Sequence, residues 1–168
     1  VEIKARVGDL DAVERRTRRI ADEGPVVLIQ EDTFFRCTEG RLKLRKFDDR
    51  NGELIAYSRA DASGPKASQY AIHPTADPDG LRDLLASALG IRGIVRKRRV
   101  LYLVGRTRVH LDRVEGLGDF TELEVVLGPG DTDEEGTREA HALMETLGLG
   151  ELVSGAYVDL LLGSRKQE

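Results

Sequence analysis

The strongest constraint on this sequence is the alternation of charged and apolar residues within several short segments. Residues 41–45 read Arg-Leu-Lys-Leu-Arg, and residues 122–124 read Glu-Leu-Glu. Because successive side chains of a β-strand point to opposite faces, each segment predicts a strand with one apolar and one charged face. The alternation therefore predicts a β-sheet whose charged face carries cations on some strands and carboxylates on others.

Short runs of this kind, separated by Gly, Asp and Asn turn signals, predict strands along the chain. They fall at residues 1–7, 26–30, 33–36, 41–47, 54–59, 67–72, 93–104, 107–114 and 120–127. Apolar residues at helical spacing predict helices at residues 10–23, 78–89 and 131–147, with another short helix within 149–162. Many sequential strands and few helices indicate an antiparallel α+β domain, for which a closed barrel is one arrangement.

Composition excludes several classes of protein. A length of 168 residues with 40% hydrophobic residues favours a single domain over residues 1–168. One cysteine, Cys37, cannot build a disulfide framework and fits a reducing compartment. No apolar run approaches the roughly 18 residues of a membrane helix, and residues 1–4 lack the features of a secretory signal. We therefore expect a cytoplasmic protein without a membrane partner.

The formal net charge of −4 hides a segregation of charge along the chain. Residues 92–113 carry eight basic and one acidic residue, whereas residues 114–168 carry three basic and 13 acidic residues. The charged strand faces have two interpretations: a sheet face in water, or the polar inner face of a barrel that holds a polyanion and its metal ions. Because the aromatic content is 5% and the basic run at residues 96–99 is short, no nucleic-acid partner is expected.

A triphosphate with divalent cations suits the second interpretation. Arg and Lys side chains bind phosphate oxygens, while carboxylates bind hard cations such as Mg²⁺ or Mn²⁺. Clustered like charges repel by about 1 kcal/mol per close pair even with water-like screening, and such a ligand relieves both kinds of cluster.

Several segments together resemble the CYTH superfamily, which is named for class IV adenylyl cyclase and thiamine triphosphatase. These segments are residues 2–4, 41–45, 97–99, 107–118 and 122–124. They follow the family's order over nearly the whole chain, and the stretch from His-Leu-Asp to Glu-Leu-Glu is most similar to the class IV cyclase branch. The family signature Glu-x-Glu-x-Lys is matched by Glu2 and Lys4, and its first Glu would precede Val1.

The resemblance implies a single CYTH domain over residues 1–168. Its fold would be a closed antiparallel eight-stranded β-barrel, the triphosphate tunnel, with flanking helices. The cations that bind the triphosphate would be Arg41, Lys43, Arg45, Arg59, Lys97, Arg99 and Arg108. The ligands of Mg²⁺ or Mn²⁺ would be Glu2, Asp112, Glu122 and Glu124.

Lys4 would be the catalytic residue, either beside the phosphates or as a base toward the attacking hydroxyl or water. A lysine acts as a base only if burial and neighbouring cations lower its pKa toward neutrality. Four further residues match family positions, with a structural role as the alternative: Lys66, Ser68, Tyr157 and Asp159. His110 shares the charged face and is expected to be structural.

The activity implied is a phosphorus–oxygen lyase reaction that converts ATP to cyclic AMP and pyrophosphate. The first alternative is a triphosphatase that hydrolyses thiamine triphosphate, inorganic triphosphate or a nucleotide, because the same residues serve both reactions. The second is a binder of triphosphate or polyphosphate without catalysis. The expected partner is a nucleoside or organic triphosphate, and a homodimer is a further option.

Overall fold

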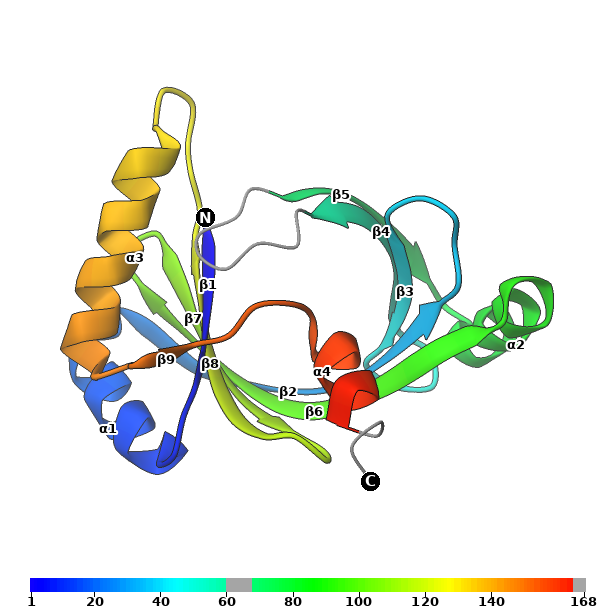
Figure 1. Ribbon diagram of the computed structural model, residues 1–168, viewed down its shortest axis with the longest axis horizontal. Helices are drawn as coiled ribbons and strands as arrows, with labels where there is room; N and C mark the ends of the chain where they lie inside the picture. The colour runs from blue at the N-terminus through cyan, green and yellow to red at the C-terminus, as the bar shows by residue number, and fades with distance from the viewer. Residues whose placement is uncertain (60–67, 165–168) are drawn as a thin grey trace.

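The computed structural model describes residues 1–59 and 68–164, with side chains described at 1–58 and 70–163. Within these residues, nine strands form one antiparallel sheet and four helices flank it (Figure 1). In sheet order the strands are β5 (Ser68–Thr75), β4 (Gly52–Arg59), β3 (Arg41–Lys46), β2 (Glu23–Phe35), β6 (Ile91–Val104), β7 (Thr107–Val114), β8 (Gly118–Val125), β1 (Glu2–Arg6) and β9 (Glu151–Leu152). The helices are α1 (Leu10–Ile20), α2 (Pro78–Leu89), α3 (Asp133–Leu147) and α4 (Tyr157–Ser164).

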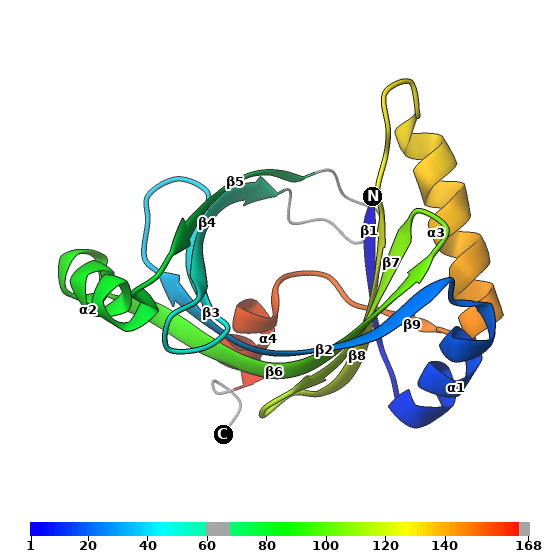
Figure 2. The same cartoon turned by 180° about the vertical axis from the view of Figure 1, so that it is seen from behind.

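The sheet curves around its two longest strands. β2 and β6, of 13 and 14 residues, pair antiparallel along almost their whole length. On one side of this pair β3, β4 and β5 rise as a wall, and on the other side β7, β8 and β1 rise as the facing wall (Figures 1 and 2). The result is a concave face enclosed by strands on three sides.

The predicted antiparallel sheet with flanking helices is confirmed, but the predicted closure of eight strands is not. The described strands number nine, and the edge strand β5 pairs with β4 alone. At the other edge, β9 contributes two residues that pair with Ala5 and Arg6 of β1. The two walls therefore face each other through curvature of the sheet, without a closing ladder of hydrogen bonds among the described strands.

The main hydrophobic core lies on the convex face, beneath α1 and α3. The β1–β8 ladder places Ile3 opposite Leu123, in agreement with the alternation in the sequence, and both side chains are buried. Val109 of β7 is buried beside them, and Leu143 and Leu147 of α3 pack on the same cluster. Apolar residues of these strands thus face the helices, which leaves the charged residues of the same strands on the concave face.

Polar caps fix the helix ends. The Asp9 carboxylate accepts a hydrogen bond from the Ala12 amide at 2.8 Å and begins α1. This helix ends at Ile20, three residues earlier than predicted, because the Asp22 amide donates to the Leu103 carbonyl at 2.8 Å and β2 begins at the next residue. In the described part of the chain, no helix combines the length and apolar character needed to cross a membrane.

A second correction concerns β2, for which the sequence predicts two strands separated at residues 31 and 32. The structure has one continuous strand, because both acidic side chains find cationic partners across the sheet. The Glu31 carboxylate accepts a hydrogen bond from Arg96 at 2.7 Å on the convex face. The Asp32 carboxylate accepts one from Arg45 at 2.8 Å on the concave face. The acidic pair at residues 31 and 32, which the sequence predicts as a break, therefore lies within a continuous strand.

The C-terminal segment packs against the concave face. The sequence predicts one short helix within residues 149–162, whereas the structure has β9 followed by α4. Tyr157 and Val158 join a buried cluster with Phe34 and Phe120. At Gly93 of β6, a methyl side chain would lie 2.8 Å from Val158, so the absence of a side chain at Gly93 makes room for α4.

Candidate active site

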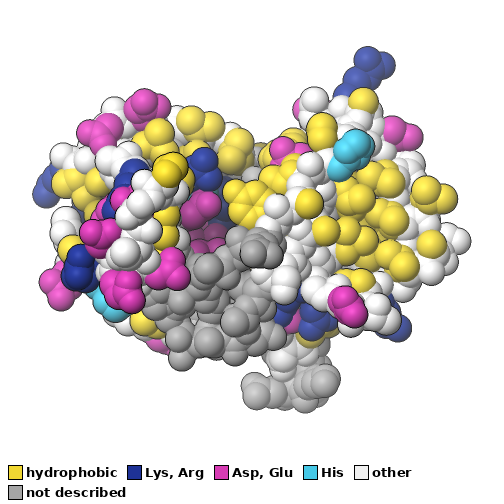
Figure 3. All heavy atoms as spheres, turned by 90° about the horizontal axis from the view of Figure 1, so that it is seen from above, with side chains coloured by type: hydrophobic (Ala, Val, Ile, Leu, Met, Phe, Trp, Pro, Cys, Tyr) yellow, Lys and Arg dark blue, Asp and Glu magenta, His cyan; other side chains and the backbone are white. Residues whose placement is uncertain are grey.

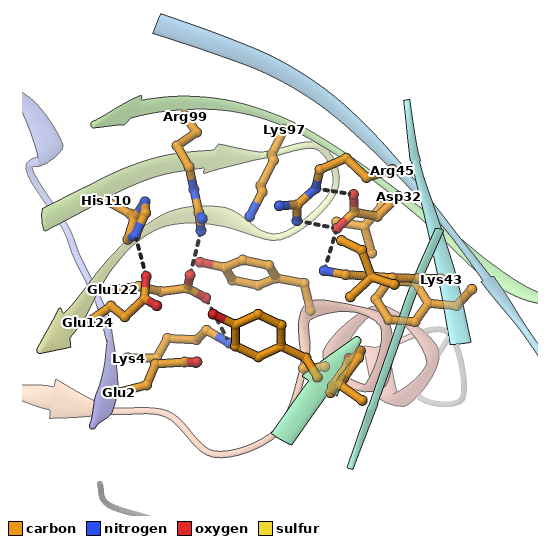
Figure 4. A pocket seen from close by; sticks show the side chains of 17 residues that line it. Glu2, Lys4, Asp32, Lys43, Arg45, Lys97, Arg99, His110, Glu122 and Glu124 are labelled. Carbon is orange, nitrogen blue, oxygen red and sulfur yellow. Dashed lines mark hydrogen bonds and ion pairs between the residues drawn. The ribbon is translucent and has the colours of Figure 1, made fainter. Parts of the chain in front are cut away.

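The concave face encloses a cavity of about 220 Å³ that receives side chains from β1 to β8 and from α4 (Figure 4). Seen from above, acidic and basic side chains gather in the recess between the two walls (Figure 3). The described lining includes nine charged residues and one histidine: Glu2, Lys4, Asp32, Lys43, Arg45, Lys97, Arg99, His110, Glu122 and Glu124. Eight of the twelve predicted site residues are among them. Arg41, Arg108 and Asp112 are not, and the Arg59 side chain lies outside the described residues.

Asp32 organises the cations of one wall. Its carboxylate accepts two hydrogen bonds from the Arg45 guanidinium, at 2.8 and 2.7 Å, and one from the Lys43 ammonium at 3.0 Å. Burial alone would raise the pKa of Asp32, but the charges of Lys43 and Arg45 outweigh it and hold that pKa far below its usual value. The Lys43 ammonium also lies 5.6 Å from the centre of the Phe34 ring. Asp32 therefore stays ionised and fixes both cations on the concave face.

Asp112 binds the two cations of the cavity floor, which is the part of the concave face formed by β6. These cations are Lys97 and Arg99. Asp112 is 0% exposed, and its carboxylate accepts two hydrogen bonds from Arg99, each at 2.6 Å. Lys97 and the Tyr157 hydroxyl donate to the same carboxylate at 3.2 and 2.9 Å. The family resemblance implied that Asp112 is a metal ligand, whereas the structure places it outside the cavity lining and surrounds it with donors. It acts on the site through the two cations that it positions.

The charge of Lys97 depends strongly on its surroundings. Burial lowers the pKa of Lys97, and the adjacent Arg99 charge lowers it further, to about 8, although Asp112 opposes this shift. Arg99 keeps its charge at any ordinary pH. The floor of the cavity thus combines a permanent cation with one that can lose its proton just above neutrality.

Glu122 links Lys4 to Arg99. Its carboxylate lies 3.0 Å from the Lys4 ammonium and forms a very short ion pair with Arg99. Burial would raise the pKa of Glu122, but Lys4 and Arg99 hold it well below its usual value. Lys4 also donates to the Gly155 carbonyl at 3.1 Å, and its ammonium lies 4.2 Å from the centre of the Tyr157 ring. Lys4 is therefore held by contacts with both β8 and the C-terminal segment.

Glu2 and Glu124 form a pair of carboxylates across β1 and β8. They are directly opposite each other in the ladder, and both line the cavity. His110 contacts Glu124 at 3.3 Å through Nε2, and Arg108 contacts it at 3.4 Å from outside the cavity. Burial and the Arg99 charge lower the pKa of His110, which makes the ring neutral near pH 7. With Nε2 donating to Glu124, the Nδ1 atom of His110 is a buried acceptor without a partner among the described residues.

The carboxylates fit a divalent cation that is shared with a substrate. Among the described residues, no three His, Cys, Asp or Glu side chains are already grouped to hold a metal by themselves. Mg²⁺ commonly binds to one or two carboxylates and takes its remaining oxygens from water and substrate phosphates. Glu2 and Glu124 offer two such carboxylates at the cavity. Glu122, a third carboxylate of the cavity, is paired with Lys4 and Arg99.

The remaining predicted residues lie elsewhere. Arg41 forms an ion pair with Asp159 of α4 at 2.6 Å. Arg108 has a side chain that is 46% exposed and contacts Glu124 from outside the cavity. Arg59 is the last residue of β4, and its side chain is outside the described set, as are Lys66 and the Ser68 side chain. The described cavity is therefore built from a smaller set of cations than the sequence predicted.

Two functional candidates were missed or undervalued from the sequence. Asp32 falls in the predicted break between strands, although it alternates with Gln30 and Phe34 and so shares their face. Tyr157 lies on a helix that packs onto the concave face, and no strand periodicity could reveal which residues it would meet there. The signal for Asp32 was present in the sequence, whereas the signal for Tyr157 required the fold.

Comparison with known proteins places the chain in a family. Residues 1–156 match the CYTH domain model, so the chain belongs to the CYTH domain family. Adenylate cyclase CyaB of Aeromonas hydrophila is 30% identical over 143 residues, which cover 80% of this chain and 70% of the relative. The resemblance inferred from the motifs is thus confirmed.

Solved structures share the fold. The PH1012 protein of Pyrococcus horikoshii OT3 matches with a TM-score of 0.83 and 24% identity, covering 96% of this chain and 98% of its own. HpAC1 of Hippeastrum, described as having a dominant triphosphatase activity, matches with a TM-score of 0.70 and 17% identity, covering 97% and 95%. These similarities establish the fold alone.

Proposed function

We propose that the cavity binds a triphosphate together with divalent cations and that the chain catalyses cleavage of a phosphorus–oxygen bond of this substrate. Membership of the CYTH domain family and the similarity to an adenylate cyclase support this proposal. Cyclisation of ATP is the leading candidate. In that reaction the 3′-hydroxyl oxygen bonds to the α-phosphorus, the bond to pyrophosphate breaks, and the hydroxyl proton leaves with a basic group or water.

The charge balance of the site is the observation that carries the proposal. Among the described residues, five cations of the site are matched by five carboxylates. The cations are Lys4, Lys43, Arg45, Lys97 and Arg99, and the carboxylates are those of Glu2, Asp32, Asp112, Glu122 and Glu124. A triphosphate carries about four negative charges near neutral pH, so binding it alone would leave a large excess of negative charge in a partly buried site. Two divalent cations would restore the balance. The site therefore favours a metal–triphosphate complex over either component alone.

The residues divide the work accordingly. Lys43 and Arg45 on one wall and Lys97 and Arg99 on the floor would donate hydrogen bonds to phosphate oxygens, as positioned cations do in phosphoryl transfer. Glu2 and Glu124 would hold a divalent cation, which when bound neutralises charge on the phosphate oxygens.

We assign Lys4 the catalytic role of an ammonium donor to the reacting phosphate. Its nitrogen forms an ion pair with the Glu122 carboxylate, donates a hydrogen bond to the Gly155 carbonyl and lies beside the Tyr157 ring, and these contacts favour the charged form of the amine. This arrangement supports the phosphate-side alternative for Lys4 over the alternative in which it acts as a base.

An aromatic pair at the cavity supports a nucleoside or organic triphosphate as the substrate. Tyr57 and Tyr70 are directly opposite each other in the β4–β5 ladder, and both line the cavity. Tyr70 is 59% exposed, which leaves its ring accessible at the site. Aromatic rings commonly stack on nucleobases and other flat groups. Phosphates would thus bind in the charged interior, with the organic group against Tyr70.

Triphosphate hydrolysis is the second candidate. Here a water oxygen bonds to the terminal phosphorus, the bond between that phosphorus and its bridging oxygen breaks, and the diphosphate part of the substrate leaves. The terminal group is released as inorganic phosphate, and the proton of the attacking water passes to solvent. The similarity in fold to HpAC1, and the triphosphatase activity reported for that protein, support hydrolysis as the second candidate reaction. Both reactions would use the same cations and carboxylates, and they differ in which phosphorus faces the attacking oxygen.

The test is incubation of the purified chain with ATP and Mg²⁺ or Mn²⁺, with cyclic AMP, pyrophosphate and phosphate measured together. Equal amounts of cyclic AMP and pyrophosphate are expected. Phosphate release without cyclic AMP would favour the second candidate, and calorimetric binding without any product would identify a non-catalytic binder. Arg99→Gln should abolish product formation, whereas Arg98→Gln, which alters the exposed neighbour on the opposite face of β6, should not.

A further inference from the structure

A second cavity, of about 330 Å³, lies where β2 ends and where β3 and β6 begin. We call it the arginine cavity, because Arg36, Arg41 and Arg92 line it. The described residues that line it include no carboxylate. Phe34 lines both this cavity and the active-site cavity. Three guanidinium groups at one small cavity would attract an anion.

One carboxylate, from α4, joins two of these arginines. The Asp159 Oδ2 atom lies 2.6 Å from Arg41 Nη1, and Oδ1 lies 2.7 Å from Arg92 Nη2. The side chains of Asp159 and Arg92 are 26% and 40% exposed, so this pair can be reached from solvent. Here two guanidinium groups bind two oxygens of one anion. Arginines bind the oxygens of a phosphate group in the same arrangement. Asp159 therefore occupies a position suited to a phosphate group.

The backbone of β6 is irregular at Arg92. In the β2–β6 ladder Phe34 pairs with Gly93, but Phe35 pairs with Ile91, so Arg92 is an extra residue in an otherwise regular pairing. Such a bulge changes the direction of a side chain at the expense of local pairing. Here it lies at the residue whose guanidinium reaches Asp159. The bulge thus accounts for how two arginines from different strands converge on one anion.

We propose that the arginine cavity is a second oxyanion site, for inorganic phosphate or pyrophosphate, in which the anion replaces Asp159 between Arg41 and Arg92. Arg36 supplies a third cation at the same cavity. When the anion replaces Asp159, the ion pairs that connect α4 to β3 and β6 are lost. Because α4 also carries Tyr157, which contacts Lys4 and Asp112, binding at this site loosens the helix that completes the active-site cavity.

This inference goes beyond the proposed function, because anion binding here requires no turnover. Calorimetric titration of the full chain with inorganic pyrophosphate, without metal, tests it. Asp159→Asn keeps the size of the side chain and removes the competing charge, so pyrophosphate affinity at this site should rise about tenfold. Arg92→Gln should lower it about tenfold or more, and Arg92→Lys, which keeps the charge and loses the forked geometry, should be intermediate.

Arg98→Gln is the matched control, because Arg98 is an exposed arginine of the same strand outside the arginine cavity. It should leave the titration unchanged. Parallel titrations with inorganic phosphate distinguish the two anions: tighter Arg92-dependent binding of pyrophosphate assigns the site to it, and the reverse assigns it to phosphate. Identical isotherms for the wild type, Arg92→Gln and Asp159→Asn would overturn the proposal.

Hydrogen–deuterium exchange tests the effect on α4. Pyrophosphate should speed amide exchange in α4 of the wild type, whereas in Asp159→Asn exchange should already be fast without the anion. Arg92-dependent binding with unchanged exchange in α4 would overturn the release of the helix. Failure of the proposed function would be seen differently, as an absence of product from ATP in a chain that still shows Arg92-dependent binding of pyrophosphate.

Discussion

The Tyr157 hydroxyl donates a hydrogen bond to the Asp112 carboxylate at 2.9 Å, joining α4 to the strand β7. Asp112 is completely buried and also binds Lys97 and Arg99. The same tyrosine ring lies 4.2 Å from the Lys4 ammonium and 5.0 Å from that of Lys97. A single side chain from the C-terminal helix therefore contacts both lysines and the carboxylate on which the cavity floor depends.

Loss of the Tyr157 hydroxyl should cost measurable stability. Tyr157→Phe keeps the ring and removes one hydrogen bond to a buried carboxylate, so the free energy of unfolding should fall by about 1–3 kcal/mol. Tyr102→Phe is the matched control, because its hydroxyl donates to Glu14, whose side chain is 24% exposed and can bind water instead. Urea denaturation of both variants measures the difference. An equal loss in the two would contradict the role given to the buried bond.

Substitution of Asp112 should reduce stability, whereas substitution of Glu124 should reduce metal affinity. Asp112→Asn leaves Lys97 and Arg99 without their shared anion, so unfolding should become easier by about 3–5 kcal/mol. Glu124→Gln, at a side chain that is 34% exposed, should change stability little and weaken Mn²⁺ binding in the presence of a triphosphate. Denaturation and metal titration of both variants separate the effects. A weaker metal affinity in a folded Asp112→Asn protein, with Glu124→Gln unaffected, would restore Asp112 as the ligand.

Triphosphate binding should weaken above pH 8. The pKa of Lys97 is about 8, below its usual value of 10.5, so the ammonium is present below pH 8 and is lost as the pH rises through it. If the phosphates require this cation, affinity falls toward tenfold per pH unit above 8. Lys97→Arg keeps the charge over this range, and any ionisation of the ligand affects both proteins alike. Calorimetry between pH 7 and 10 should show the loss in the wild type and a flatter profile in the variant.

The ionisation of Lys97 should have the opposite effect on the stability of the fold. Because the unfolded chain holds the Lys97 proton more tightly than the folded chain, the contribution of this group to stability rises with pH between about 8 and 10.5. Lys97→Arg should lack this rise, which denaturation curves at several pH values can measure.

Removing the aromatic ring at Tyr70 should change substrate preference. Tyr70→Ala should raise KM for ATP by roughly fivefold to 150-fold, which corresponds to about 1–3 kcal/mol of stacking. KM for inorganic triphosphate should stay the same, because that substrate has no group to stack. Parallel kinetics with the two substrates provide the measurement. An equal rise for both would mean that Tyr70 shapes the phosphate site instead.

Strand faces could be predicted from the sequence because they follow from a local rule. Alternation placed Lys43 and Arg45 on one face and Leu44 on the other, and the structure has the two cations at the cavity and the leucine buried. Whether the charged face met water or an enclosed space depended on the curvature of the whole sheet. That curvature arises around β2 and β6, and the alternation in any one strand does not encode it.

The misplaced residues share a physical cause. Asp112 has the same parity as Glu122 and Glu124 within the charged faces, so periodicity could not distinguish a buried counter-ion from a carboxylate at the cavity. Arg41 has the parity of Lys43 and Arg45, but it is the first residue of β3, and its guanidinium pairs with Asp159 of α4. Where a helix from the far end of the chain packs, tertiary contacts decide the role of each charge.

Lys4 reaches its partners Gly155 and Tyr157 across more than 150 positions of sequence. A chain emerging from the ribosome therefore holds its first strand long before the residues that complete the surroundings of Lys4 have been made. Such distant contacts also slow folding, because a long loop must close before they form. During synthesis, the completed pocket is among the last features to assemble, and nascent chains that end before α4 should not acquire it.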